Sequence, residues 1–489
     1  MNRFELLSVT NSFSDTEAKE DDDNESSNKT CNDLEADKSR LEKQMSTESL
    51  KKKKKKKKKL RQQKSVENEL NTPDHDDIEA SINEVNKILG HCVTLDERKE
   101  EVKSSDVKSN ALKLFCIEHR NLNPDNELKR IFGSKTVASE QSVSNRRKAR
   151  GRVTPHRSWI LANPRNLQTI GKPPINMQLV KTEGEGKDAE LHFNFVHSKT
   201  YQNIQFQFFN AVESYNPENL VALLNTYPFH IDTLIQFSDV CRMGEDIQMA
   251  AELIERALHS FETILHPSFN VTQGNCRLDF RVPENRSFFI ALFKHILFVG
   301  QRGCNRTALE FCKLLLGLDP NGDPLCVLQM IDFYAIRSGQ FDYLVELYDS
   351  WRDSRKLWLF PNFRYSIALT YFLKSQSASA NDCSAILDEA DKHLKEALVL
   401  FPNVLLPLLD RCSVEPDSEV LKYPCFARSK HVSQSLQHLS SIFIGRNFML
   451  WKEKETMAWM ERNVREIVTE YKANDPLILD ADEKYTRLS

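Results

Sequence analysis

Small and apolar residues recur at helical spacing from about residue 200 to residue 410. The clearest case lies between 230 and 266, where two stripes with spacings of four and three residues stand on either side of Gly244. Their members are Leu234, Ser238 and Cys241, then Ala250, Ile254 and Ala257. Small residues such as Ala250 and Ala257 let two helices approach closely, as in tetratricopeptide repeats. The pattern therefore predicts a pair of antiparallel helices with a break at Gly244.

Similar stripes occur in four further stretches of the chain. They comprise Tyr201, Ile204, Phe208 and Val212; Leu292, Ile296, Val299, Ala308, Cys312 and Leu315; Leu328, Asp332, Ala335, Leu344, Tyr348 and Trp351; and Ala368, Tyr371, Ala390, Leu394 and Ala397. A polar loop is expected at 375–382, between the last two helices. One helix pair cannot bury its apolar face alone, so neighbouring pairs should stack. We predict an all-α fold in which 200–410 is a tetratricopeptide-like helical-repeat solenoid; a generic helical bundle is the alternative.

Apolar stripes continue beyond the repeats. They consist of Leu439, Phe443 and Ile444, and then of Met449, Leu450, Trp451, Met457, Trp459 and Val464. We predict that 411–489 forms a C-terminal helical cap on the solenoid. Within the repeats, an insertion at 266–285 carries Phe269, Leu278 and Phe280, which should hold it against the surface.

Residues 106–135 form an apolar island in a polar part of the sequence. Asn123-Pro124 is a helix start signal, and the helix should run through Phe132 and stop at Gly133. Such islands often fold on a partner. As a docking segment, its apolar anchors would be Leu128, Ile131 and Phe132. The alternative is that the island packs on the chain's own repeats.

Residues 136–199 are predicted to be an extended linker that contains prolines and a basic cluster at 146–152. At its end, Leu191, Phe193 and Phe195 alternate with polar residues. This alternation predicts a short strand leading into the repeats.

The composition of the N-terminal residues 1–105 differs from that of the rest of the chain. Residues 1–105 are rich in Lys, Glu, Asp, Ser and Asn, so they cannot bury enough apolar surface to offset the entropy of ordering. We expect a disordered, charge-rich arm. The net charge of −3 conceals an acidic tract and a later lysine run. That run is Lys51, Lys52, Lys53, Lys54, Lys55, Lys56, Lys57, Lys58 and Lys59.

Three interpretations of the lysine run remain open: an arm on nucleic-acid phosphates, a nuclear import signal, or a solubilising linker. Lysine alone reads no base sequence, so any nucleic-acid contact should be non-specific.

No catalytic pattern is recognisable in the sequence. The 11 cysteines have no paired or zinc-type spacing, which indicates free thiols in a reducing compartment. Gly184 to Lys187 resembles the end of a phosphate-binding loop, but Lys181 stands where the first glycine is needed. The longest apolar run, 288–299, contains Lys294 and is too short for a bilayer. We therefore expect no enzyme activity, no cofactor, no metal and no membrane partner.

The predicted solenoid also has a candidate binding groove. Each repeat is a pair of helices, and the first helix carries one large apolar residue that defines the spacing. The residues one and five positions after it usually line the concave face of the solenoid. The resulting apolar candidates are Phe293, Leu297, Phe333, Tyr365 and Leu369, with Ile235, Asp239 and Gln329 beside them. A mostly apolar wall should hold an apolar helix or strand, either from a partner or from the chain itself.

Several long blocks resemble the transcription factor 25 family, which is also the ribosome quality control complex subunit 1 family. The matching blocks are 122–133, 270–289, 323–326, 404–413 and 450–453. The acidic tract and lysine run fit the family's layout, and the resemblance covers about 110–485. The chain ends soon after these blocks, where relatives continue.

The resemblance implies a non-catalytic adaptor that assists ubiquitylation and clearance of stalled nascent chains on large ribosomal subunits. Its implied partners are a listerin-type ubiquitin ligase, ubiquitin, a nascent-chain-tailing factor, an AAA-type unfoldase and the large ribosomal subunit. The lysine run would add an rRNA contact. The implied location is cytoplasmic and ribosome-associated, and a nuclear pool is also compatible with the resemblance. The older family name implies the alternative, a nuclear transcriptional repressor with a basic nucleic-acid-associated arm.

Overall fold

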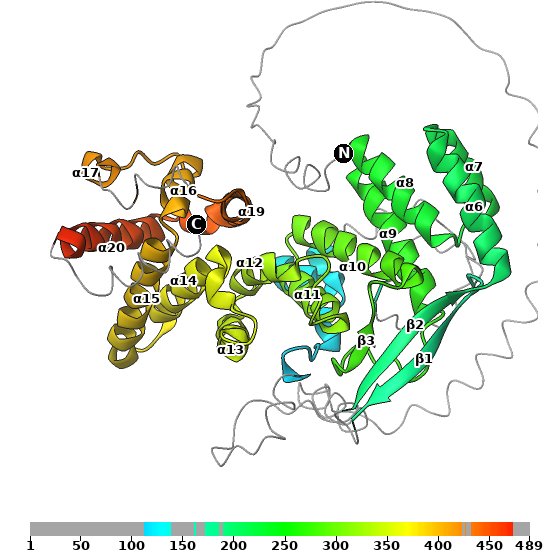
Figure 1. Ribbon diagram of the computed structural model, residues 1–489, viewed down its shortest axis with the longest axis horizontal. Coiled ribbons are helices and arrows are strands. Elements are labelled where there is room, and N and C mark those ends of the chain that lie inside the picture. Colours follow the sequence, from blue (N-terminus) through cyan, green and yellow to red (C-terminus); the bar gives the residue numbers. More distant parts are fainter. Residues whose placement is uncertain are drawn as a thin grey trace, which may run out of the picture. The chain divides into compact units, whose positions relative to one another are not determined.

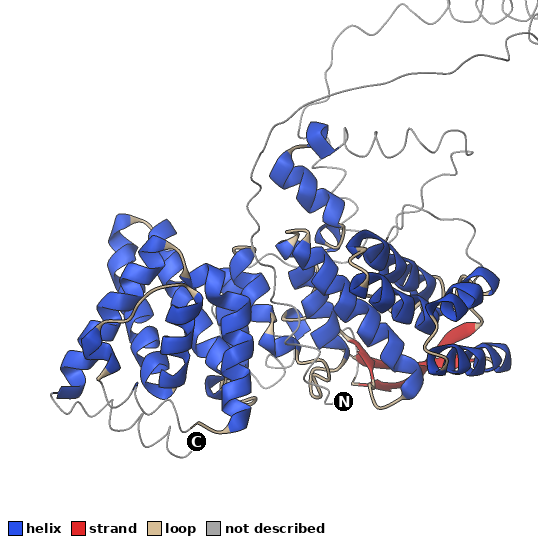
Figure 2. Ribbon diagram, turned by 90° about the horizontal axis from the view of Figure 1, so that it is seen from above, coloured by secondary structure: helices blue, strands red, loops and turns tan. Residues whose placement is uncertain are grey.

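The computed structural model describes residues 112–137, 161–162, 172–184, 189–422, 426 and 432–472. All described residues lie within one compact unit, Lys99–Ser489. This unit is mostly helical with a small sheet (Figures 1 and 2). The predicted disordered arm, 1–105, lies outside the described residues.

Most of the helices from α6 onward are joined by short connections, whereas α9 and α10 are separated by the insertion that contains β3 (Cys276–Leu278). In order they are η2 (His119–Asn121), α4 (Pro124–Phe132), α6 (Lys199–Glu213), α7 (Pro217–Thr226), α8 (Ile231–Met243), α9 (Ile247–Glu262), α10 (Pro283–Gln301), α11 (Asn305–Leu318), η4 (Val327–Gln329), α12 (Ile331–Arg337), α13 (Phe341–Trp351), η5 (Leu357–Leu359), α14 (Pro361–Ser377), α15 (Ala380–Leu400), η6 (Pro402–Val404), α16 (Leu405–Arg411), α17 (Ser418–Leu421), α19 (Gln434–Trp451) and α20 (Lys454–Lys472).

Local signals account for many helix starts. Asn216 accepts a hydrogen bond from the Glu218 N–H at 3.0 Å, and Pro217 occupies the first turn of α7. Asp246 accepts from the Met249 N–H at 2.9 Å and caps α9. Both side chains satisfy an amide that lacks a partner within its helix.

The predicted break between α8 and α9 is confirmed, because the two helices end and begin at Met243 and Ile247. Ala250 and Ala257 are completely buried where α9 packs on its neighbours. The Ser238 hydroxyl donates to the Ala250 carbonyl across the pair at 2.9 Å. Small residues therefore bring these two helices together, as their spacing predicted.

The loop predicted at 375–382 is wrong. Helix α14 continues to Ser377 and α15 begins at Ala380, so the connection is only two residues long. The Ser379 hydroxyl donates to the Asp382 carboxylate at 2.7 Å in the first turn of α15. The polar residues of this stretch thus belong to helix ends, where serine and aspartate are common.

The all-α prediction is corrected by a three-stranded sheet in the order β1-β2-β3. Strands β1 (Ile175–Glu183) and β2 (Glu190–His197) form an antiparallel hairpin, and β3 (Cys276–Leu278) pairs with β2 in parallel. Part of the segment expected to be an extended linker is therefore a paired hairpin.

The predicted strand at 191–195 lies within β2. Its alternation places Phe193 and Phe195 in the core, where each is 1% exposed. The Phe193 ring lies 5.2 Å from Phe269 of the insertion, and the Phe195 ring lies 5.0 Å from Phe261 of α9. The sheet is therefore fixed to the helices by one apolar face, which extends their core.

None of the helices in the described part of the chain is both long and apolar enough to cross a bilayer.

Candidate functional site

The apolar island packs against its own chain. Leu114, Phe115, Ile117 and Leu122 are buried in the main core, and the segment lies beside α11 (cyan in Figure 1). The structure thus agrees with the alternative prediction for 106–135, in which the island packs on the chain's own helices.

Two glycines make room for Phe115. A Cβ atom at Gly274 would lie 2.7 Å from the Phe115 Cβ, and one at Gly317 would lie 3.2 Å from it. Gly274 also has a φ of +68°, a conformation that favours glycine. The insertion and α11 thus pack closely on either side of Phe115.

Glu127 of α4 caps the N-terminus of α11. Its two carboxylate oxygens accept from the Arg306 N–H at 2.9 Å and from the Thr307 N–H at 2.8 Å. The α11 N-cap residue, Cys304, makes no side-chain capping bond of its own. A buried carboxylate at a helix N-terminus is stabilised by both the free amides and the helix dipole.

A buried ionic cluster adds to this attachment. The Glu310 carboxylate lies 3.2 Å from the Arg306 guanidinium and 3.0 Å from the Lys313 ammonium. It also accepts from the Glu118 N–H at 3.0 Å. Because Glu118 belongs to the island and the other residues to α11, the cluster joins two segments that are distant in sequence.

The three predicted docking anchors differ in their environment. Leu128 is half-buried against the core, whereas Ile131 and Phe132 are 51% and 61% exposed. Every residue from 129 to 136 is exposed. We call residues 129–136 the α4 tip.

The predicted groove residues also divide into two groups. Phe293, Leu297 and Phe333 are half-buried and contact the core from its edge. Tyr365 and Leu369 are instead buried, at 0% and 1% exposed, so their assignment to an open groove wall is corrected.

Helix α19 explains the burial of Tyr365. The Tyr365 ring lies 5.5 Å from Phe443 and 5.8 Å from Trp451, and its hydroxyl donates to the Phe401 carbonyl at 3.0 Å. Arg446, also on α19, donates to the Gln329 carbonyl. At this end, the chain's own helix therefore fills the position expected for an apolar ligand.

Helix α20 is fastened to α15 through Asp391. The Asp391 carboxylate accepts from Trp459 Nε1 at 2.6 Å, from Arg462 at 2.6 Å and from Asn463 Nδ2 at 3.0 Å. A carboxylate with three donors is a strong polar contact, because charged hydrogen bonds exceed neutral ones.

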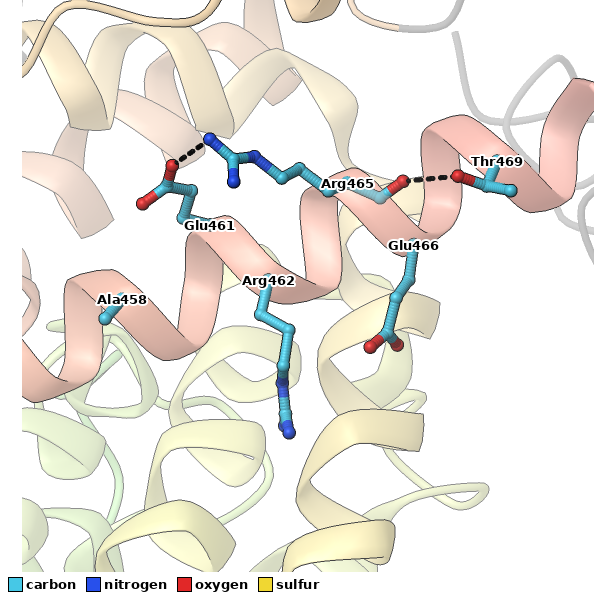
Figure 3. Close-up of a pocket in the computed structure, with 6 residues that line it drawn as sticks. All are labelled: Ala458, Glu461, Arg462, Arg465, Glu466 and Thr469. Atoms are coloured by element: carbon cyan, nitrogen blue, oxygen red, sulfur yellow. Dashed lines mark hydrogen bonds and ion pairs between the residues drawn. The ribbon is translucent and has the colours of Figure 1, made fainter.

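A depression of about 500 Å³ lies along α20. It is lined by Ala458, Glu461, Arg462, Arg465, Glu466 and Thr469 (Figure 3). In this view Arg465 reaches back to Glu461, whereas Arg462 and Glu466 extend to the other side of the helix. Its lining side chains all come from one helix and their charges are already paired, so they do not converge on a common point.

Three potential ligand groups meet at the turn end of the hairpin, where β1 leads into β2. The ligand atoms of Glu183, Glu190 and His192 all lie within 4.8 Å of one another. Lys181 pairs with Glu183, and Arg277 donates to Glu190 at 2.8 Å. The hydrogen bond and charge of Lys181, with the charge of His192, lower the pKa of Glu183. The two carboxylates thus already have cationic partners, and the cluster is explained as an ion-pair network.

The buried histidines are neutral structural groups. Burial lowers the pKa of His230 and of His295 to about 3 in each case. The His230 ring nitrogens lie 2.7 Å from the Thr233 hydroxyl and 3.1 Å from the Gln205 side-chain oxygen. These contacts connect α6 with α8 and leave no free nitrogen on His230 for chemistry.

The candidate basic-arm residues Lys51–Lys59 lie outside the described residues, so their role stays a prediction.

Comparison with known proteins points to one family. The family profile described as "Transcriptional repressor TCF25" matches residues 193–488. Proteins from Homo sapiens and Mus musculus named "Ribosome quality control complex subunit TCF25" are each 44% identical to the chain over 369 residues, which is 75% of this chain and 53% of theirs. The chain thus spans about half the length of these relatives.

A more distant relative carries a related name. The Schizosaccharomyces pombe protein named "Ribosome quality control complex subunit 1" is 36% identical over 275 residues, which is 55% of this chain and 40% of that protein. No solved structure matches the chain.

Proposed function

The chain belongs to the TCF25 family, and we propose that it acts as a non-catalytic adaptor subunit of the ribosome quality control complex. The observation that carries the proposal is the 44% identity to the human subunit over 369 residues. In this role it assists ubiquitylation and clearance of stalled nascent chains on large ribosomal subunits.

The proposed mechanism is positioning. The protein would hold ubiquitin or the listerin-type ligase so that one lysine faces the incoming thioester. Orientation of two reactants alone accelerates a reaction by orders of magnitude, so an adaptor needs no catalytic group. The nascent-chain-tailing factor, the AAA-type unfoldase and the large ribosomal subunit are the further partners that we propose.

The helical body supports this role as a rigid scaffold. Ala257 and Ala397 are completely buried at helix contacts, and Asp391 and Glu127 fix α20 and α4 to the body. We propose that these helix pairs form a tetratricopeptide-like solenoid. We propose that its groove is the edge at Phe293, Leu297 and Phe333, where these side chains are only half-buried. Tyr365, by contrast, is covered by α19.

The lysine run is proposed to be an electrostatic tether to rRNA. Each lysine that neutralises a phosphate releases condensed counterions, so binding should weaken steeply as salt rises. Replacement of Lys51–Lys59 by glutamine should reduce co-sedimentation with ribosomes at low salt and change it little at high salt. If only nuclear accumulation falls, the run is an import signal and the tether is disproved.

A second candidate function is nuclear transcriptional repression. It is favoured by the description of the family profile that matches 193–488, "Transcriptional repressor TCF25". Fractionation separates the two functions. The adaptor sediments with large ribosomal subunits in the cytoplasm, whereas a repressor is found in nuclear fractions free of them.

A further inference from the structure

The α4 tip combines three cations with two exposed apolar side chains. Lys129, Arg130 and Lys135 all lie within 129–136, and this stretch contains no acidic residue. Within the described part of the chain, none of the three forms an ion pair. Ile131 and Phe132 lie between them, with more than half of each side chain exposed.

The stability of α4 explains only part of this arrangement. Lys129 and Arg130 stand in the last turn, where positive charge complements the helix dipole. Lys135 lies beyond α4 and has no such role. The exposed apolar pair contributes little to folding, because the buried side of α4 is already provided by Glu127 and the half-buried Leu128. The exposed apolar pair and the three cations are therefore available to bind a partner.

We propose that the α4 tip binds single-stranded RNA exposed on the large ribosomal subunit. Single-stranded RNA is recognised by aromatic rings that stack on bases and by cations that contact phosphates. Phe132 supplies the ring, and Lys129, Arg130 and Lys135 supply the cations. This inference rests on the proposed function, because it takes the ribosome as the source of the RNA.

Two observations favour RNA over an acidic protein segment. The α4 tip has three cations, two apolar side chains and no acidic residue. This composition suits RNA, because RNA carries one negative charge on every nucleotide. Gly133 follows the ring with a φ of +84°, and no atom lies within 4 Å of the place where its Cβ would be. The backbone beside Phe132 is therefore open to close approach by a sugar-phosphate chain.

The test uses the full chain with Lys51–Lys59 replaced by glutamine, so that the lysine run does not dominate binding. The probe is a fluorescein-labelled oligouridine of about 12 nucleotides, a length that suits stacking sites. Phe132→Ala should raise the Kd about tenfold, the usual size of one lost base–aromatic stack. Phe206→Ala is the matched control, because Phe206 is a 66% exposed phenylalanine on α6.

The cations are tested by salt dependence. Lys129→Gln, Arg130→Gln and Lys135→Gln together should flatten the slope of log affinity against log salt by about 2, the value for three phosphates on a single strand. The control replaces three other exposed cations, Arg337, Arg352 and Lys452, by glutamine. It should leave the slope of log affinity against log salt unchanged. All variants should melt close to the parent, because no buried contact is removed and exposed charges at a helix end contribute little to stability.

The proposal is overturned if Phe132→Ala binds the oligouridine as tightly as Phe206→Ala does. It is also overturned if RNA affinity is unchanged but co-sedimentation with large subunits falls, since the tip would then bind a ribosomal protein. If Phe132→Ala weakens RNA binding while the parent chain fails to sediment with ribosomes, the RNA site stands and the proposed function fails.

Discussion

At the scale of single residues, close helix contacts depend on small side chains. Ala257 and Ala397 are completely buried, so Ala257→Leu and Ala397→Leu should each overpack a contact and lower the free energy of unfolding by about 1–3 kcal/mol. Ala222→Leu is the control, because Ala222 is exposed on α7. Urea or thermal unfolding measures the difference. Unchanged unfolding of both core variants would contradict the assigned packing.

A single carboxylate caps α11. Glu127→Ala leaves the Arg306 and Thr307 amides without their acceptor and should cost about 1–2 kcal/mol, the range for a lost helix cap. Hydrogen exchange at these two amides should become faster. Glu415→Ala, at an exposed position, should leave both amides as they were. Equal protection in the two variants would show that Glu127 is not the cap.

Buried His295 gives stability a pH dependence of known sign. Its folded pKa is about 3, below its usual 6.5, so between these values the unfolded chain binds more protons than the folded one. Its contribution to stability is therefore present above pH 6.5 and is lost as pH falls toward 3. Burial also raises the pKa of Asp332, which makes the free energy of unfolding fall as pH rises. The effect of His295 must therefore be isolated by substitution of that residue.

His295→Leu should flatten the plot of unfolding free energy against pH between 6 and 4 by up to about 1.4 kcal/mol per pH unit. His119→Leu is the control at an exposed histidine. If the two variants show the same slope, His295 is not titrating as its burial requires.

At the scale of elements, local patterns predicted most helices and one strand. The spacing of Ala250 and Ala257 gave α9, and the alternation of Phe193 and Phe195 gave β2. The complete sheet could not be predicted, because β3 lies in the insertion and pairs with β2 from a distant part of the sequence. Periodicity places Tyr365 on a predicted groove face because it identifies a helix face but not the element that covers that face, here α19.

The attachment of α20 gives a prediction at this scale. Asp391→Ala removes the acceptor for Trp459, Arg462 and Asn463, so the free energy of unfolding should fall by more than about 1.5 kcal/mol, as expected for charged hydrogen bonds. Hydrogen exchange should accelerate along α20. Asp388→Ala, on the same helix but exposed, provides the control. Equal exchange in the two variants would exclude Asp391 as the attachment point.

At the scale of the whole molecule, the described residues form a body that presents separate surfaces. The half-buried edge at Phe293 and Phe333 and the exposed α4 tip are carried by different elements of this body. The candidate site was predicted only in part. Sequence identified the apolar positions, but exposure of Ile131 and burial of Leu369 depend on contacts that no local pattern encodes.

We propose that this protein acts by positioning ubiquitin or its ligase. The most direct measurement is ubiquitylation of a stalled nascent chain on purified large ribosomal subunits, with the listerin-type ligase, in the presence and absence of this protein. We expect that adding the protein changes the rate or the lysine linkage of the ubiquitin chains. Identical rates and linkages with and without the protein would contradict it.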